Sequence, residues 1–169
     1  MNDLLKTSLW KQFGAAIETL DAAIDACPDH LWDAVIWADE EDPRYGQFWF
    51  LAFHTVKWLN LYLDATPSDD YVVPPPFLHG RLPDQPYAKA DVRAFLQVSR
   101  EKCKATIEAL TDESAYRECV YEWMQPTFIE LLMYSMRHTQ EHAGQLNYFL
   151  GEHGIGGLDW ISYVGQYAD

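Results

Sequence analysis

The sequence contains only three cysteines among 169 residues, and they lie far apart. Cys27, Cys103 and Cys119 form no Cys-x-x-Cys pair, which is the spacing that thiolate zinc sites and redox motifs use. Their number is also odd, so a disulfide scheme would leave one of them unpaired. We therefore expect reduced, structural thiols in a reducing compartment, and the cysteines argue against a thiolate metal site.

Basic residues are scarce as well. Twelve Lys and Arg stand against 26 Asp and Glu, and the net charge is -14. The acidic residues are spread along the chain and do not gather in one tail. A surface of this charge repels the phosphates of nucleic acids and the headgroups of anionic membranes. We therefore expect no nucleic-acid partner and no membrane partner.

Long apolar runs are absent, since no stretch of roughly 18 uncharged apolar residues occurs. The longest apolar run, residues 48–56, is interrupted by His54 and followed by Lys57. This excludes a transmembrane helix. The N-terminal segment is amphipathic and lacks the basic start, apolar block and cleavage site of a signal peptide. The expected location is cytoplasmic.

The alternation of apolar and polar residues that is typical of strands is also missing. Apolar residues instead recur at steps of three and four, which predicts helices. Four long helices with a long second connection are typical of a four-helix bundle, so we expect an all-α fold in a single domain, residues 1–169. The predicted helices are residues 2–26, 45–63, 89–110 and 126–150.

Proline is concentrated in the second connection. Residues 65–91 hold six of the nine prolines and cannot form a regular element. A loop of this length usually carries function, and we expect it to cover a site. Its Arg81 is a candidate for selecting an acidic substrate group. Its His79 is a candidate fourth ligand or substrate contact, with an exposed loop position as the alternative. A Gly-rich tail, residues 151–169, is expected to pack back on the body.

Two histidines interrupt the apolar pattern of the last helix. His138 and His142 lie four residues apart, which places them about 40° apart on one helical face, one turn above the other. Two imidazoles in this arrangement can bind one metal ion. The alternative is a pair of partly exposed helix histidines. Ser135 and Gln145 share their face, away from the charged stripe, so the pair should face partner helices, where unpaired imidazoles would cost free energy.

His54 in the second helix is the best candidate for a third ligand. A single histidine among apolar residues is more often a hydrogen-bonded core residue, but here it is one of three on predicted inward faces. Three neutral imidazoles leave positions open on an ion, which is typical of a catalytic site. Zinc and nickel suit such ligands, and manganese and iron remain alternatives.

A carboxylate-bridged pair of metal ions is disfavoured, because that site needs a Glu three residues before a ligand histidine. Ser135 stands at that place before His138, and Thr139 stands there before His142.

A histidine in the second helix and His-x-x-x-His-x-Gly-Gln-Leu in the fourth resemble the DinB/YfiT-like superfamily of metalloenzymes. The motif spans residues 138–146 of this chain. The resemblance implies a four-helix bundle in which His54, His138 and His142 hold a single divalent metal ion, and it implies frequent homodimers. Characterised relatives include transferases and isomerases that use low-molecular-weight thiols, and some hydrolase-like members.

We therefore expect a metal-dependent transferase or hydrolase that activates a thiol or water. One alternative is a non-catalytic, metal-stabilised binding or stress-related bundle, and another is a structural bundle whose histidines hold no metal. The sequence identifies no general base. Tyr134 is either a donor to a substrate oxygen or, more simply, a core tyrosine.

Two further residues of the motif invite interpretation. Gly144 is expected to let a neighbouring element approach the last helix closely. Gln145 either hydrogen-bonds a ligand histidine or fixes helix packing.

The last helix also has a second apolar flank, which suggests a subunit contact and hence a homodimer. That flank consists of Ile129, Leu132, Met133, Met136, Ala143 and Leu150.

Overall fold

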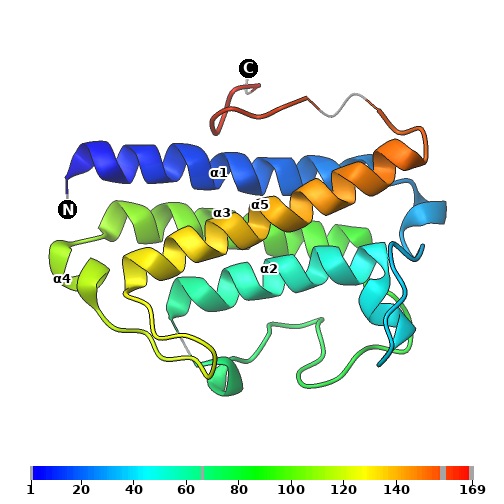
Figure 1. Cartoon of the computed structure of the whole chain (residues 1–169), viewed down its shortest axis with the longest axis horizontal. Helices are drawn as coiled ribbons and strands as arrows, with labels where there is room; N and C mark the ends of the chain where they lie inside the picture. The colour runs from blue at the N-terminus through cyan, green and yellow to red at the C-terminus, as the bar shows by residue number, and fades with distance from the viewer. Residues whose placement is uncertain (1, 66, 157–158, 168–169) are drawn as a thin grey trace.

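The computed structural model of the chain describes residues 2–65, 67–156 and 159–167. Figure 1 shows four long helices running side by side, which confirms the predicted all-α bundle. Within the described residues there is no β-strand, and none of the helices combines the length and hydrophobicity needed to cross a membrane. The helices are α1 (Asp3–Ala26), α2 (Phe48–Asp64), α3 (Lys89–Ala109), the short α4 (Asp112–Tyr116) and α5 (Phe128–Glu152).

Some predicted ranges extend past the described part of the chain. The predicted domain, loop and tail include residues 1, 66, 157, 158, 168 and 169, which lie outside the described residues. The single domain stays a prediction.

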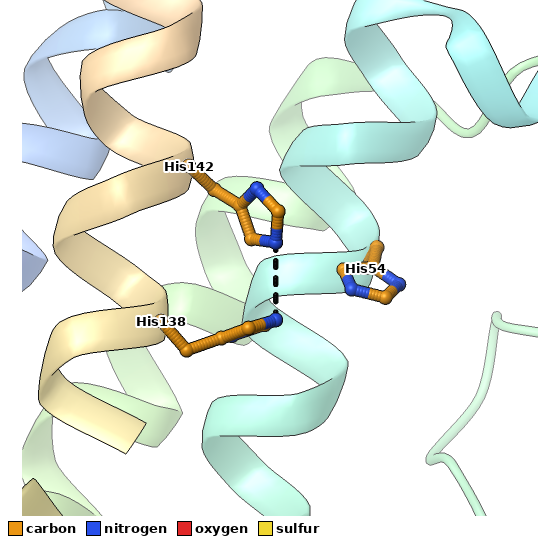
Figure 2. Close-up of side chains that lie close together, drawn as sticks. All are labelled: His54, His138 and His142. Atoms are coloured by element: carbon orange, nitrogen blue, oxygen red, sulfur yellow. Dashed lines mark hydrogen bonds between the residues drawn. The ribbon is translucent and has the colours of Figure 1, made fainter. Parts of the chain in front are cut away.

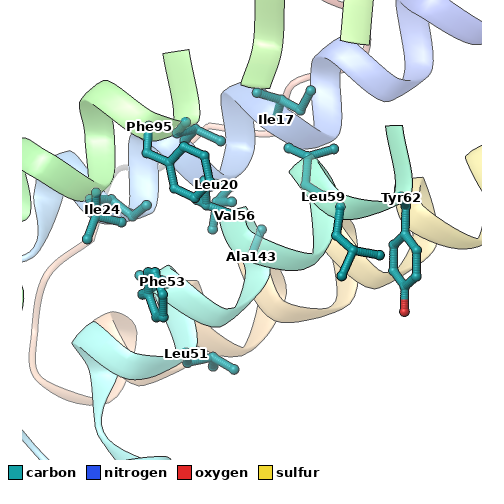
Figure 3. Close-up of a cluster of buried hydrophobic side chains, with 14 of the residues drawn as sticks. Ile17, Leu20, Ile24, Leu51, Phe53, Val56, Leu59, Tyr62, Phe95 and Ala143 are labelled. Atoms are coloured by element: carbon teal, nitrogen blue, oxygen red, sulfur yellow. The ribbon is translucent and has the colours of Figure 1, made fainter. Parts of the chain in front are cut away.

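Helices α3 and α5 each pack against both α1 and α2. Leu20 and Ile24 of α1, Leu59 of α2 and Ala143 of α5 belong to one core cluster, and all four side chains are completely buried (Figure 3). Burying a leucine or isoleucine side chain contributes about 1.5–3 kcal/mol, so this core fixes the relative position of α2 and α5. These are the two helices that carry the candidate histidines.

Two helix starts differ from the prediction, and local hydrogen bonds explain both. Residues 43–46 form a 3-10 turn, because the Asp42 carboxylate accepts a hydrogen bond from the Arg44 backbone N–H, and α2 begins only at Phe48. At α5, the Glu130 carboxylate accepts hydrogen bonds from the backbone N–H and the hydroxyl of Thr127. This capping box makes Thr127 the N-cap residue. Helix α5 therefore begins at Phe128, two positions later than predicted.

The three cysteines are free and buried, in agreement with their predicted structural role. Burial raises the pKa of the Cys27 thiol to about 11. It also raises the pKa of Cys103 above its ordinary value. Thiols of this kind are protonated at neutral pH and are poor nucleophiles.

The tail packs on the body as expected, for its described residues 159–167, and runs along α1 (Figure 1). The backbone N–H of Val164 donates to the carbonyl of Lys11 at 3.0 Å. Gly14 makes this approach possible, because a Cβ atom at that position would lie only 2.6 Å from the Val164 side chain. The expectation for Gly144 is wrong: it is exposed, and a Cβ there would meet no described atom within 4 Å.

These two glycines give a matched pair of variants. We expect Gly14→Ala to displace the tail, so that chymotrypsin cleaves beside Tyr163 several times faster than in the wild type. Gly144→Ala should leave the tail protected and stabilise α5 by up to about 1 kcal/mol, because alanine favours a helix over glycine. Equal cleavage rates in the Gly14→Ala variant and the wild type would show that the contact with Val164 does not hold the tail.

Candidate metal site

Helices α2 and α5 bring the three candidate histidines together. Figure 2 shows His138 and His142 projecting from successive turns of α5 toward α2, which carries His54. One ring nitrogen of each histidine lies within 4.8 Å of the other two, and the Nε2 atoms of His138 and His142 are 3.0 Å apart. The predicted convergence of the three imidazoles is therefore confirmed. Their role as ligands stays a prediction.

The spacing and chemistry of the group fit a metal ion. Nitrogens that bind one zinc at 2.0–2.1 Å lie at most about 4 Å from one another. The pair on α5 already meets this condition. The largest separation of 4.8 Å exceeds it by less than about 1 Å. The group consists of imidazoles alone, so it suits zinc or nickel better than magnesium or calcium, which prefer oxygen ligands.

The surroundings of the cluster keep two of the imidazoles neutral. Burial, followed by the nearby His138, His142 and Lys57 as smaller causes, lowers the pKa of His54 to about 3. Burial also lowers the pKa of His138 to about 4, with His142 as the second cause. A histidine must be neutral to bind a metal, so at pH 7 both rings are in the required state.

Gln145 fixes the orientation of one candidate ligand. Its Oε1 atom lies 2.7 Å from Nδ1 of His142. An amide oxygen only accepts hydrogen bonds, so Nδ1 carries the proton and the lone pair of Nε2 faces the cluster. The structure thus supports the interpretation that Gln145 hydrogen-bonds a candidate ligand histidine.

His138 is incompletely paired by protein groups. Its Nε2 lies against His142, but its Nδ1 is buried and has no hydrogen-bond partner among the described residues. Unpaired buried polar atoms are rare in folded proteins and often mark functional sites. This orphaned atom belongs to the same cluster that fits a metal ion.

Removing the Gln145 contact should weaken metal binding. We expect Gln145→Ala to lower zinc affinity roughly 10- to 100-fold, because the His142 ring loses the partner that sets its tautomer and orientation. Gln145→Glu keeps an accepting oxygen and should retain most of the affinity. Competition with a zinc chelator measures both. An unchanged affinity in Gln145→Ala would mean that the contact serves helix packing only.

Aromatic rings surround the cluster. The ring of Tyr134 stacks beside His138 with centroids 6.4 Å apart, and Tyr62 lies edge-on to the same histidine at 6.5 Å. The rings of Tyr62 and Tyr134 also pack edge-on, with centroids 5.5 Å apart. Tyr134 thus lies packed among rings, which supports the simpler interpretation of a packed tyrosine.

The remaining histidines lie outside the cluster. His30 is exposed in a 3-10 turn, and Nδ1 of His153 donates to the Phe149 carbonyl at 2.9 Å, near the end of α5. His79 is exposed in the proline-rich loop and is not part of the metal-capable group found among the described residues. The fourth-ligand role considered for His79 therefore lacks support from this arrangement.

A pocket of about 530 Å³ lies beside the cluster and shares His54 with it. One wall is formed by residues of α2, including Lys57 and Trp58, and another by the proline-rich loop, including His79 and Arg81. That the loop covers the site stays a prediction. Lys57 went unnoticed as a pocket residue in the sequence, although its position three residues after His54 places it on nearly the same helical face.

The low pKa values predict how stability depends on pH. In the unfolded chain these histidines bind a proton near the ordinary pKa of 6.5, but in the folded protein only near pH 3 or 4. Their contribution to the free energy of unfolding is therefore fully present above about pH 7. It is lost as the pH falls toward the pKa values of the folded protein. Between pH 7 and pH 5 we expect a loss of about 1–2 kcal/mol per histidine in the metal-free protein.

Urea unfolding in the presence of a chelator measures this slope. Paired carboxylates such as Asp42, whose pKa is lowered by Arg44, act in the same direction, so a control is needed. His138→Phe removes one of the two histidines and should reduce the change in the free energy of unfolding between pH 7 and pH 5. Identical slopes in the variant and the wild type would contradict the account.

The bundle and its cluster define a helical protein whose three histidines are positioned to bind a metal ion. Comparison with protein families agrees with this class: the model of the DinB superfamily matches residues 12–146, a range that contains all three histidines. The chain belongs to the DinB superfamily. No curated protein and no solved structure matches it. The tail that packs on α1 lies outside the matched range.

Proposed function

We propose that the protein is a metal-dependent enzyme of the transferase or hydrolase type, in which His54, His138 and His142 hold one divalent ion. Zinc or nickel is the expected ion, with manganese and iron as alternatives. The observation that carries the proposal is the meeting of three ring nitrogens within 4.8 Å of one another, from two different helices. The group contains no thiolate and no carboxylate, so three neutral ligands leave positions open for a reactant.

The residues around the cluster have distinct tasks in this proposal. Burial keeps His54 and His138 neutral, and Gln145 directs the lone pair of His142 toward the shared centre. The ring of Trp58 lies edge-on to His54 at 6.2 Å and limits access of water from that side. When bound, the ion supplies Lewis acidity that lowers the pKa of a thiol or water toward neutrality.

The homodimer implied by the resemblance stays a prediction. The second apolar flank of α5 no longer argues for it strongly, because Leu132, Ala143 and Leu150 are completely buried within the chain. Met133 is 41% exposed and remains available for a contact. A mass equal to one chain in light scattering would exclude the dimer. The cytoplasmic location also remains a prediction.

Turnover assays separate the enzyme from a non-catalytic metal-stabilised bundle. The protein is loaded with zinc, nickel or manganese and mixed with electrophilic and ester substrates, with and without a low-molecular-weight thiol such as glutathione or cysteine. The proposal predicts metal-dependent turnover that is lost in His54→Ala. If bound metal raises the melting temperature but no substrate reacts, the non-catalytic alternative is favoured.

A further inference from the structure

The pocket beside His54 combines positive charge with an apolar wall. Lys57 of α2 and Arg81 of the loop both line it. Of the described residues that line it, Asp69 is the one acid. A formal excess of positive charge in this pocket stands out in a chain whose net charge is -14. Two cations against one acid make this pocket a more favourable place for an anion than the acidic chain as a whole.

Neither cation has a carboxylate partner in the part of the chain that the structure describes. No ion pair of Lys57 or Arg81 occurs among the described residues, although other basic side chains of the chain are paired. The Lys57 ammonium lies 5.5 Å from the centre of the Trp58 ring and is half-buried. Burial lowers its pKa from the ordinary value. A half-buried ammonium without a carboxylate partner is stabilised when an anionic ligand supplies one.

The rest of the lining suits a carbon skeleton. Phe50, Phe53, Val73 and Leu78 contribute to the same pocket. Ligand sites commonly consist of such apolar walls with a few polar groups that fix orientation, and a volume of about 530 Å³ is in the usual range for small molecules. His54 belongs to both the pocket and the histidine cluster, so a molecule held here lies next to the candidate reactive centre.

We propose that this pocket binds a small organic acid, with Lys57 and Arg81 holding its carboxylate and the aromatic and aliphatic wall holding its carbon skeleton; that this acid is a substrate rests on the function proposed above. Arg81 supplies a planar fork of N–H donors that matches a carboxylate, and Lys57 supplies a point charge from the other wall.

Two matched probes test the inference on metal-free, full-length protein. 4-Phenylbutanoate and 4-phenylbutanamide share a carbon skeleton and differ in charge, and removal of metal prevents the carboxylate from binding an ion directly. NMR titration gives the two Kd values. We expect the acid to bind roughly tenfold or more tightly than the amide, because charge-assisted hydrogen bonds to the acid replace neutral ones.

Four variants assign the preference to residues. Lys57→Gln and Arg81→Gln should each reduce the preference for the acid several-fold, and the double variant should abolish it. Lys104→Gln makes the same change in net charge on α3, outside the pocket, and should leave the preference intact. Circular dichroism confirms that each variant is folded.

The outcomes separate this inference from the proposed function. Equal affinities of the wild type for acid and amide, or a preference that survives in the double variant, overturn the carboxylate pocket. Zinc is then added to the same metal-free proteins, and its binding is measured separately. A wild type that binds no metal but prefers the acid contradicts the proposed function and leaves the carboxylate pocket supported.

Discussion

Replacing His142 by alanine lowers the affinity for zinc at least about 100-fold while the protein remains helical. The expected loss exceeds the 10- to 100-fold typical of partners outside the ligand set, because one of three candidate ligands disappears. His142 lies 3.0 Å from His138 and is oriented by Gln145. The group found among the described residues has no fourth member that could take its place. It is only partly buried, which keeps the effect on folding small.

His153→Ala is the matched control. This histidine lies at the end of the same helix and makes its hydrogen bond to the Phe149 carbonyl, outside the cluster. Its removal should leave zinc affinity unchanged. Isothermal titration calorimetry measures both variants, and far-ultraviolet circular dichroism reports their helix content. Equal zinc affinity in His142→Ala and His153→Ala would contradict the three-histidine site.

Leu59→Ala destabilises the bundle by about 2–5 kcal/mol, the usual range for removing a buried leucine side chain. Leu59 is completely buried and packs in the centre of the core, one and a half turns along α2 from His54 (Figure 3). Its truncation removes apolar contacts and leaves a cavity that the surrounding helices fill only in part. The expected result is a clearly lower urea midpoint in metal-free protein.

Leu4→Ala makes the same chemical change at a position that is 73% exposed on α1. Its free energy of unfolding should stay within about 0.5 kcal/mol of the wild type. If both variants lose the same stability, Leu59 does not occupy the core position that the fold assigns to it.

The long helices could be predicted because their apolar residues repeat with the helical period over many turns. Their ends were less predictable, since short-range hydrogen bonds decide them. The capping box of Thr127 with Glu130 and the bond between Asp42 and the Arg44 backbone determine where α5 and α2 begin. The short α4 was not among the predicted helices, because five residues carry too little periodicity to reveal a helix.

The histidine cluster was accessible from sequence because two of its members lie four residues apart on one helix. The pocket was only partly accessible, because its walls come from α2 and from a loop whose path follows no periodic rule. Lys57 was missed for that reason. The role of Gly144 was wrong because a glycine in a helix can face either a neighbour or open space, and only the three-dimensional packing decides between them.

The central claim is that three imidazoles from α2 and α5 hold one metal ion. Anomalous diffraction at the zinc absorption edge, from crystals grown with zinc, tests it most directly. The account predicts a single strong peak within about 2.0–2.1 Å of one ring nitrogen each of His54, His138 and His142. A peak elsewhere, or no peak while His138 and His142 stay hydrogen-bonded to each other, would contradict it.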